Sequence, residues 1–442
     1  MQRIFSDFAY GPGPRSGCWW DATVELSKRL ALEAAIDVDV AIIGAGFTGL
    51  SAALTLAEGG ARVAVLEAQH VGWGASGRNG GFCCLGGAKA DDAELDKKFG
   101  KDARLDFRRA EVQAVRHVEA TLALFEIDVD RHSDGETALA HRASDMRAMQ
   151  QSAADIRENY DVEPRFHAPG DLAAAGMNAE GFFGAMTVPI GFGLNPRKYV
   201  DGLARAAESA GAEIFEATPV RQIARRDGKW VVQAAQSEVR AEQVIVATNG
   251  YSSEDLPDWL KARYLPTQSN VLVTRPMTET ELSEQGWFTD QMSFDTRNMV
   301  HYFRLMPDRR FLFGMRGTIQ SSPQAERRAR ANTRRHFERM FPRWSHVETT
   351  HAWSGMVSLA FNKVPYVGAV PDSQGLWAAM CYHGNGVAMG SYSGRLIAEL
   401  ALGGQAQDRP SVMAHPMRRF PLGSLRRALV PPLYASLMWQ DR

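Results

Sequence analysis

Apolar and polar positions follow a recognisable order near the start of the chain. A short apolar run, Val40–Ile43, leads into glycines spaced as Gly44-x-Gly46-x-x-Gly49. The following stretch, residues 50–59, is compatible with a helix, and a second apolar run, Val63–Leu66, ends at Glu67. Short apolar runs bounded by turn residues are typical of buried strands. The pattern therefore predicts a strand–helix–strand unit.

The glycine spacing in this unit has a physical reason at each position. Gly44 permits the tight turn out of the strand, Gly46 lets the backbone approach a pyrophosphate, and Gly49 lets the helix pack close to the strand. The helix N-terminus directs unpaired N–H groups and the positive end of its dipole at the phosphates. Glu67 can accept hydrogen bonds from ribose hydroxyls. We expect a bound dinucleotide; a Rossmann-like unit without a ligand is the alternative.

A glycine-rich segment, residues 71–81, follows the second run directly. Five glycines within ten residues are unfavourable in the interior of a helix or strand. Small residues interspersed with Ser76, Arg78 and Asn79 suit a loop that presses its backbone against a flat ligand. We therefore expect contact with the rest of the same dinucleotide, and a mobile surface loop is the alternative.

The remaining chain alternates between helical and strand-like periodicity. We expect helices at 23–35, 105–125, 143–160, 197–210, 323–341 and 391–402. We expect strands at 213–215, 229–233, 243–250, 268–274, 299–305, 311–314 and 376–380, and a turn at Trp353-Ser354-Gly355. The strand at 376–380 leads through a glycine-rich turn into the last helix, which is a second helix start suited to a phosphate or a ring.

This order of elements predicts a mixed α/β fold with a Rossmann-like βαβ domain and an inserted antiparallel sheet. We expect residues 1–35 to form an N-terminal arm and residues 404–442 a C-terminal packing tail. The dinucleotide-binding domain is expected to be discontinuous, comprising residues 36–90, 187–252 and 349–403. Residues 91–186 and 253–348 would form a substrate or cap domain.

The overall composition narrows the class of protein. The chain has 442 residues, a formal net charge of −1 and four cysteines. The balanced charge argues against nucleic-acid binding as the main task. The cysteines form no CxxC pair, which favours a reducing cytoplasm, and we expect no metal site. No run of eighteen apolar residues predicts a membrane span, and the N-terminus lacks an apolar signal core.

Four segments together carry a resemblance to a known family. They are Gly74-Ala75-Ser76-Gly77-Arg78-Asn79-Gly80-Gly81, the strand end Val244–Tyr251, Trp353-Ser354-Gly355 and His383-Gly384-Asn385-Gly386-Val387. With these, the chain resembles the flavin-dependent D-amino-acid oxidase superfamily over about residues 17–403. Within it, the chain resembles the branch of glycine oxidase, sarcosine oxidase and γ-glutamylputrescine oxidoreductase, and the last of these most.

The resemblance implies non-covalently bound FAD. The sequence agrees, because one GxGxxG follows a strand and no CxxxxC redox pair exists, so the organic substrate itself should be the reductant. Carried over residue by residue, the resemblance assigns FAD contacts to Gly44, Gly46, Phe47, Thr48, Gly49, Glu67, Ala68, Gly74, Ala75, Ser76, Arg78, Asn79, Gly80, Gly81, Val220, Gly355, Gly384, Asn385, Gly386 and Val387. Oxygen or another acceptor would take the electrons from reduced flavin.

Three positions depart from the sarcosine oxidase pattern. Ala388 stands where a lysine binds the substrate carboxylate, and Leu312 stands where a lysine activates oxygen. Met356 stands near the cysteine that attaches the flavin, which is why non-covalent FAD is expected. Cys83 and Cys84 are interpreted as buried structural thiols, although they could reach the cofactor.

The substrate end is less clearly indicated by the sequence. His383, Tyr302 and Arg316 are the candidate catalytic residues, because Arg316 could bind a carboxylate bidentately and His383 could accept a proton or orient the substrate. A structural hydrogen bond is the alternative for each. Further residues expected near the flavin are His301, Arg304 and Asn362, with Trp353 and Phe303 as an apolar wall.

The resemblance implies oxidation of a C–N bond in an amine or amino-acid derivative, with hydride transfer to the flavin. A γ-glutamylputrescine-like substrate is favoured, and an N-substituted or cyclic amino acid, such as a sarcosine- or pipecolate-like compound, is the alternative. Two other hypotheses are a non-catalytic flavoprotein and part of a tRNA-modifying enzyme. The oligomeric state is not indicated by the sequence.

Overall fold

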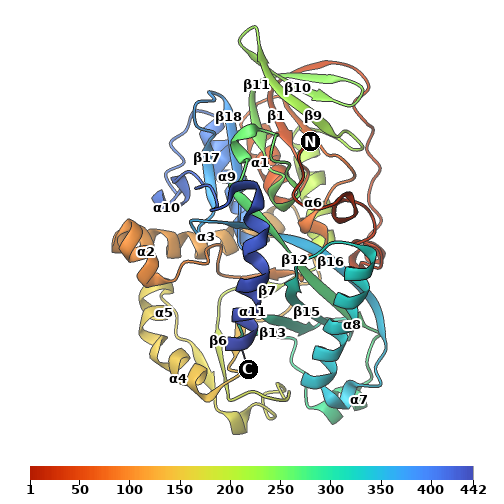
Figure 1. Ribbon diagram of the computed structural model, residues 1–442, viewed down its shortest axis with the longest axis vertical. Helices are drawn as coiled ribbons and strands as arrows, with labels where there is room; N and C mark the ends of the chain where they lie inside the picture. The colour runs from red at the N-terminus through yellow and green to blue at the C-terminus, as the bar shows by residue number, and fades with distance from the viewer. Residues whose placement is uncertain (442) are drawn as a thin grey trace.

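A computed structural model of the chain describes residues 1–441, apart from the side chains of residues 317 and 318. It contains two large sheets, one in the upper half of Figure 1 and one in the lower half. The first sheet has the strand order β17-β18-β11-β1-β2-β8, with β10 paired to β11 and β9 paired to β10. Its strands are β1 (Ile36–Ile43), β2 (Val63–Leu66), β8 (Glu213–Phe215), β9 (Val220–Arg226), β10 (Lys229–Ala234), β11 (Glu238–Val246), β17 (Tyr366–Ala369) and β18 (Leu376–Met380).

The centre of the first sheet is parallel. β1 pairs in parallel with β2 and β11, and β11 pairs in parallel with β18. Helices α1 (Phe47–Glu58), α6 (Pro196–Ser209) and α9 (Ala388–Ala401) cover one face. Buried apolar residues of β1 pack against these helices on one face and against Trp230 and Leu376 on the other. Ligands bind at the carboxyl ends of such strands, so this sheet presents one edge as a site.

The second sheet is largely antiparallel and has the order β16-β12-β15-β14-β13-β4-β6-β5, with β4 and β13 in parallel. Its strands are β4 (Glu136–Leu139), β5 (Arg165–His167), β6 (Ala185–Val188), β12 (Tyr264–Thr274), β13 (Met292–Asp295), β14 (His301–Leu305), β15 (Phe311–Thr318) and β16 (Thr349–Ala360). Phe303, Phe311 and Phe313 pack on one face against α8 (Pro323–Met340). Part of the opposite face packs against Trp20, and the rest, called the free face below, borders a cavity.

The other elements lie around these sheets. They are α2 (Asp92–Phe99), α3 (Lys101–Leu124), α4 (Ala143–Gln151), α5 (Ala153–Tyr160), α7 (Glu279–Gln285), α10 (Ser411–Ala414), α11 (Val430–Gln440) and the short strands β3 (Phe82–Cys83) and β7 (Phe192–Gly193). Helix α11 runs along the front of Figure 1. None of the helices within residues 1–441 is both long and apolar enough to cross a lipid bilayer.

Most expected elements are present, and four expectations were wrong or incomplete. Residues 23–35 form no helix, because tertiary contacts hold them against the body of the protein: Arg29 pairs with Glu208, and the backbone N–H of Leu32 donates to Thr218. Residues 353–355 form no turn but lie inside β16. The expected helix at 143–160 is divided at Ser152 into α4 and α5, and β4, between the expected helices at 105–125 and 143–160, was not predicted.

Strand β16 also pairs with β12 and so belongs to the second sheet, although its residues were assigned with the dinucleotide-binding segments. The division of the chain into domains stays a prediction.

Candidate functional site

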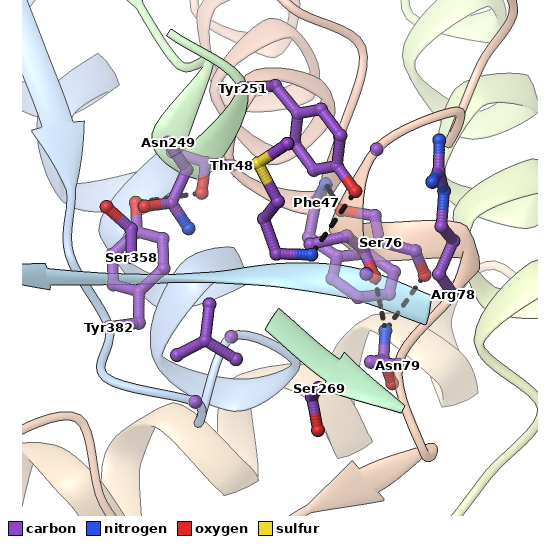
Figure 2. Close-up of a pocket in the computed structure, with 18 of the residues that line it drawn as sticks. Phe47, Thr48, Ser76, Arg78, Asn79, Asn249, Tyr251, Ser269, Ser358 and Tyr382 are labelled. Carbon is purple, nitrogen blue, oxygen red and sulfur yellow. Dashed lines mark hydrogen bonds between the residues drawn. The ribbon is translucent and has the colours of Figure 1, made fainter. Parts of the chain in front are cut away.

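A cavity of about 620 Å³ lies between the carboxyl ends of the parallel strands and the free face of the second sheet. Almost every residue expected to contact a cofactor or substrate lines it. These residues are Gly44, Gly46, Phe47, Thr48, Glu67, Ala68, Gly74, Ala75, Ser76, Arg78, Asn79, Gly80, Val220, Tyr302, Arg316, Gly355, His383, Gly384, Asn385, Gly386 and Val387. Segments distant in the sequence therefore meet around one space (Figure 2).

Two of the expected residues, Gly49 and Gly81, do not line the cavity. Gly49 acts through packing instead, because a Cβ at this position would lie 1.9 Å from the carbonyl oxygen of Gly44. A Cβ added at Gly81 would be similarly close to the carbonyl oxygen of Leu194. Both glycines support the backbone that borders the cavity.

One end of the cavity is built around the β1–α1 turn and Glu67. The two carboxylate oxygens of Glu67 accept hydrogen bonds from the backbone N–H groups of Ala45 and Gln69, each at 3.0 Å. Burial raises the pKa of Glu67, and the two backbone donors oppose that rise. The carboxylate is thereby fixed in position, and its remaining lone pairs could accept hydroxyl donors.

The glycine-rich segment is attached to the start of α1 by specific hydrogen bonds. The Ser76 hydroxyl accepts from the backbone N–H of Phe47 at 2.9 Å. The Asn79 amide donates to the carbonyl oxygens of Ala75 and Ser76 at 3.1 and 2.9 Å, as Figure 2 shows. These contacts place the segment beside a helix N-terminus, where backbone N–H groups and the helix dipole favour an anion.

Arg78 supplies a buried positive charge next to that segment. Its Nε donates to the carbonyl oxygen of Trp73 at 2.9 Å, and its guanidinium lies over the rings of Trp73 and Tyr251 at 5.2 and 5.3 Å. Burial lowers the pKa of Arg78. Its Nη2 has no hydrogen-bond partner among the described residues. A buried donor without a partner is unfavourable, so the position fits an acceptor on a bound ligand.

The turn at residues 383–387 closes the other side of the cavity. The Asn385 amide donates to the carbonyl oxygen of Leu85 at 2.6 Å and to the Cys84 sulfur at 3.3 Å, and α9 begins directly after the turn. Gly384 suits this turn because its φ of 118° is a conformation that residues with a side chain rarely adopt. A second helix N-terminus thus faces the cavity, where it favours negative charge.

His383, a candidate catalytic residue, begins this turn in a left-handed conformation with φ of 53°. Burial, followed by the positive charges of Arg316 and Lys89, lowers its pKa to about 3. Neither ring nitrogen makes a hydrogen bond of good geometry with residues 1–441. The imidazole is therefore neutral near pH 7 and can donate or accept a hydrogen bond, but it is a weak proton acceptor.

The free face of the second sheet carries the other two candidate catalytic residues. The hydroxyl groups of Tyr302 and Ser269 lie 2.9 Å apart, and burial raises the pKa of Tyr302. Arg316, on the neighbouring strand β15, pairs across the sheet with Ser269. Tyr302, Ser269 and Arg316 therefore form one polar surface that borders the cavity.

Arg316 has a second cation beside it, Lys89, which sequence reasoning missed. The Arg316 Nη2 donates to the carbonyl oxygen of His383 at 2.8 Å. The charge of Arg316 and then burial lower the pKa of Lys89 to about 8, and burial lowers that of Arg316. No carboxylate of residues 1–441 contributes to the pKa of either cation. Two neighbouring cations repel each other, and an anion bound between them would relieve that repulsion.

Several residues expected near the site lie elsewhere. His301 contacts Asp295 and His336, at 2.6 and 2.8 Å, and Arg304 donates to the carbonyl oxygens of Gly80 and Leu194. Side chains expected at the site but outside the cavity lining are His301, Arg304, Asn362, Trp353 and Phe303. Trp353 instead donates from its indole to the carbonyl oxygen of Arg78 and so supports the glycine-rich segment.

The structure also shows where the two cysteines lie and where the three positions that depart from the sarcosine oxidase pattern lie. Ala388 and Leu312 are buried outside the cavity, and Met356 lines it. Cys83 is buried away from the cavity, and Cys84 lines it. Burial raises the pKa of both thiols, so they are not nucleophiles near pH 7.

Other lining residues absent from the sequence-based set include Glu136, Tyr251 and Phe294. Glu136 begins strand β4 directly after Asp134-Gly135, a turn signal that could have revealed the strand. Lys89 follows Gly86-Gly87 without any periodic pattern, so no comparable signal exists for it.

The residues present fit a dinucleotide that ends in a flat ring. A fixed carboxylate, two helix N-termini, a close-packed backbone segment and an unpaired arginine N–H follow one another around one cavity. The family model described as "FAD dependent oxidoreductase" (DAO) matches residues 39–400. The chain belongs to the DAO family.

Similar proteins agree with this membership. A probable oxidoreductase OrdL of Haemophilus influenzae is 30% identical over 83% of this chain and 83% of that protein. The gamma-glutamylputrescine oxidoreductase of Escherichia coli is 27% identical over 90% of this chain and 91% of that protein. The crystal structure of glycine oxidase from Geobacillus kaustophilus has a TM-score of 0.71 at 21% identity, over 87% of this chain and 99% of that one.

This DAO protein is therefore an FAD-dependent oxidoreductase. The expectations of FAD, of a flavoenzyme and of the mixed α/β fold are confirmed.

Proposed function

We propose that this enzyme oxidises a C–N bond in an amine that also carries a carboxylate, and that a γ-glutamylated amine such as γ-glutamylputrescine is its preferred substrate type. The observation that carries this proposal is the pair Arg316 and Lys89, two neighbouring cations that line the cavity with no carboxylate contributing to either pKa. A guanidinium can bind a carboxylate bidentately, and a neighbouring ammonium adds a second contact. Ala388 stands where sarcosine oxidases have a lysine that binds the substrate carboxylate. We propose that Arg316 and Lys89 bind the carboxylate instead.

Similarity to curated proteins supports the choice of substrate type. The gamma-glutamylputrescine oxidoreductase matches nine-tenths of both chains. Glycine oxidases also match, at lower identity, as in Bacillus licheniformis at 25%. Both kinds of substrate carry a carboxylate and an amine, so the cation pair suits either. An N-substituted or cyclic amino acid is therefore the second candidate.

We assign the cofactor contacts to the residues around the β1–α1 end of the cavity. Glu67 would bind the adenosine ribose, the N-terminus of α1 the pyrophosphate, and residues 74–81 the ribityl chain and ring. The N-terminus of α9, with Gly384–Val387, would lie at the ring's pyrimidine end. When bound, FAD supplies a two-electron acceptor for the hydride.

The substrate contacts follow from the other end of the cavity. Arg316 and Lys89 bind and orient the carboxylate, and the paired hydroxyls of Tyr302 and Ser269 offer a hydrogen bond to the substrate. The substrate nitrogen must be uncharged when the carbon loses a hydride, because its lone pair forms the C=N bond. With a pKa of about 3, His383 fits a residue that orients the substrate better than a base.

Anaerobic reduction of the holoenzyme tests this proposal. A panel of γ-glutamylated amines, N-substituted and cyclic amino acids, and simple amines is added without oxygen, and loss of flavin absorbance is followed. We expect amines with a carboxylate to bleach the flavin. Bleaching by simple amines alone would contradict the substrate assignment, and no bleaching by any amine would favour a non-catalytic flavoprotein. Rapid bleaching by NADH would contradict the substrate as reductant.

The fate of the electrons and the attachment of the cofactor need two further measurements. Repeating the assay in air with peroxide detection separates oxygen from another acceptor. We propose that the protein works in the cytoplasm. We also propose that FAD is bound non-covalently, since Met356 lines the cavity and carries no thiol. Denaturation should then release all FAD into solution, and flavin retained on the polypeptide would contradict this.

A further inference from the structure

Three acidic side chains of the described residues line the cavity, Glu67, Glu136 and Asp295. Glu67 accepts two backbone N–H groups, whereas Glu136 has neither such a donor nor a cation beside it. Glu136 lies on β4, three strands from Arg316 in the sheet order β15-β14-β13-β4. It lines the cavity. Burial and the Cys84 thiol are the two influences on its pKa. Asp295, which also borders the cavity, differs because it is paired with His301 and Arg297.

Strand register places Glu136 and Arg316 on the same face of the sheet. Gly314 pairs with Tyr302, Tyr302 with Phe294, and Phe294 with Ala138. Arg316 lies two residues from Gly314, and Glu136 lies two residues from Ala138. Side chains two residues apart in a strand point to the same face. Both side chains therefore border the cavity from one continuous surface.

The separation of the two positions limits what can contact both. Neighbouring strands lie about 4.8 Å apart, so three spacings separate the two backbones by about 14 Å across the sheet. Arg316 and Glu136 also lie on opposite sides of the paired row, four residues apart in register, which adds about 13 Å along the strands. Both side chains can reach inward, which shortens this span but does not close it, and no ion pair joins them. The substrate end of the cavity thus has a cationic side at Arg316 and Lys89 and an acidic side at Glu136.

The immediate surroundings of Glu136 make an unpaired carboxylate unfavourable. Burial raises its pKa to about 7, and only the hydrogen bond from Cys84 opposes that rise. The Cys84 sulfur is in turn held by the amide of Asn385, on the turn that carries His383. A bound cation would supply the missing charge, and the fixed position of Cys84 would keep the carboxylate oriented.

We propose that Glu136 binds the ammonium group of the substrate, before that nitrogen loses its proton for oxidation, at the end remote from the carboxylate held by Arg316 and Lys89. This inference rests on the proposed function and narrows it. The substrate class becomes an extended amine with its carboxylate and its ammonium group separated by a chain of several atoms. A compact α-amino acid, whose two charges adjoin one carbon, cannot contact both ends. Glu136 is then a residue that determines specificity by substrate length.

A binding experiment on the holoenzyme without oxygen tests this under conditions that prevent repeated turnover. Calorimetry measures the affinity of two matched ligands, hexanoate and 6-aminohexanoate, for the wild-type enzyme and for Glu136→Gln. We expect the wild type to bind 6-aminohexanoate at least tenfold more tightly, since a hydrogen bond to a charged group contributes about 1.5–3 kcal/mol. In Glu136→Gln that preference should disappear while hexanoate affinity stays unchanged. Shorter and longer ω-amino acids should bind less well.

Asp134→Asn is the matched control, because Asp134 is an exposed acid two residues away that pairs with Arg165. It should retain the full preference for the amino ligand. Equal wild-type affinity for the two ligands, or a preference that persists in Glu136→Gln, would overturn the inference and leave the carboxylate assignment standing. Failure of hexanoate itself to bind the wild type would contradict the proposed function as well.

Discussion

The two ends of the cavity are built in different ways. At the β1–α1 end, the groups that could contact a ligand are mainly backbone N–H groups and one carboxylate, held by neighbours close in sequence, such as the Glu67 contact to Gln69. At the other end, charged side chains from β4, β15 and the segment before α2 project into the space. The first end depends on local turns, and the second on the register of distant strands.

This difference has a functional consequence. A backbone site recognises what all FAD molecules share and tolerates little change, because the chain itself forms the surface. A side-chain site can be changed one residue at a time without altering the fold. Within this family the cofactor end should thus be the constant part of the cavity, and the cations and the acid at the other end the part that sets the substrate.

The largest effect is expected from Gly49→Ala, which should break the cofactor end alone. The added Cβ would lie 1.9 Å from the carbonyl oxygen of Gly44, so α1 must move away from β1. We expect a purified protein almost free of flavin, measured as the ratio of flavin to protein absorbance. Gly170→Ala, at a glycine with open space around it, is the control and should retain full flavin.

That contrast also explains what could be predicted from sequence. The β1–α1–β2 unit, the glycine-rich segment and the turn before α9 are contiguous, and their glycines show where the backbone approaches a ligand. Lys89 and Glu136 could not be found in this way, because only pairing of β4 with β13 and the position of residues 86–90 bring them to the cavity. Trp353–Gly355 was expected as a turn because glycine is common in turns. Within β16, however, Gly355 gives room for the side chain of Arg78.

A smaller effect, at the other end, is expected from Arg316→Met. Loss of the guanidinium removes a charged hydrogen-bond donor to the substrate carboxylate, so KM should rise about tenfold to a hundredfold. Flavin content should stay at the wild-type level, which separates this variant from Gly49→Ala. Loss of flavin in Arg316→Met would show that the two ends are not independent. Arg316→Lys should restore only part of the affinity, since it lacks the planar fork.

Glu67→Gln sharpens the comparison within the cofactor end. The amide retains one oxygen acceptor but loses the charge, and one of the two backbone donors loses its partner. We expect FAD to bind about tenfold more weakly, measured by rebinding of FAD to the apoprotein, with KM for the amine unchanged once FAD saturates. An unchanged dissociation constant would show that this carboxylate makes no contact with the cofactor.

The smallest effect concerns pH at the substrate end. Lys89, with a pKa lowered to about 8, is charged below that pH and loses its proton as pH rises through it. Arg316 stays charged and His383 stays neutral across this range. Hexanoate affinity should therefore fall severalfold between pH 7 and pH 9, with bound anion moving the midpoint upward. In Lys89→Met the affinity should be lower at pH 7 and nearly independent of pH.

The central claim is that this cavity oxidises amines selected by a carboxylate at Arg316 and Lys89. Its most direct test compares γ-glutamylputrescine with putrescine, two amines that differ by the glutamyl group. The rate of flavin bleaching is measured without oxygen at equal low concentrations. We predict that the glutamylated amine reduces the flavin at least tenfold faster, and that Arg316→Met removes the difference. Equal rates in the wild type, or faster reduction by putrescine, would contradict the account.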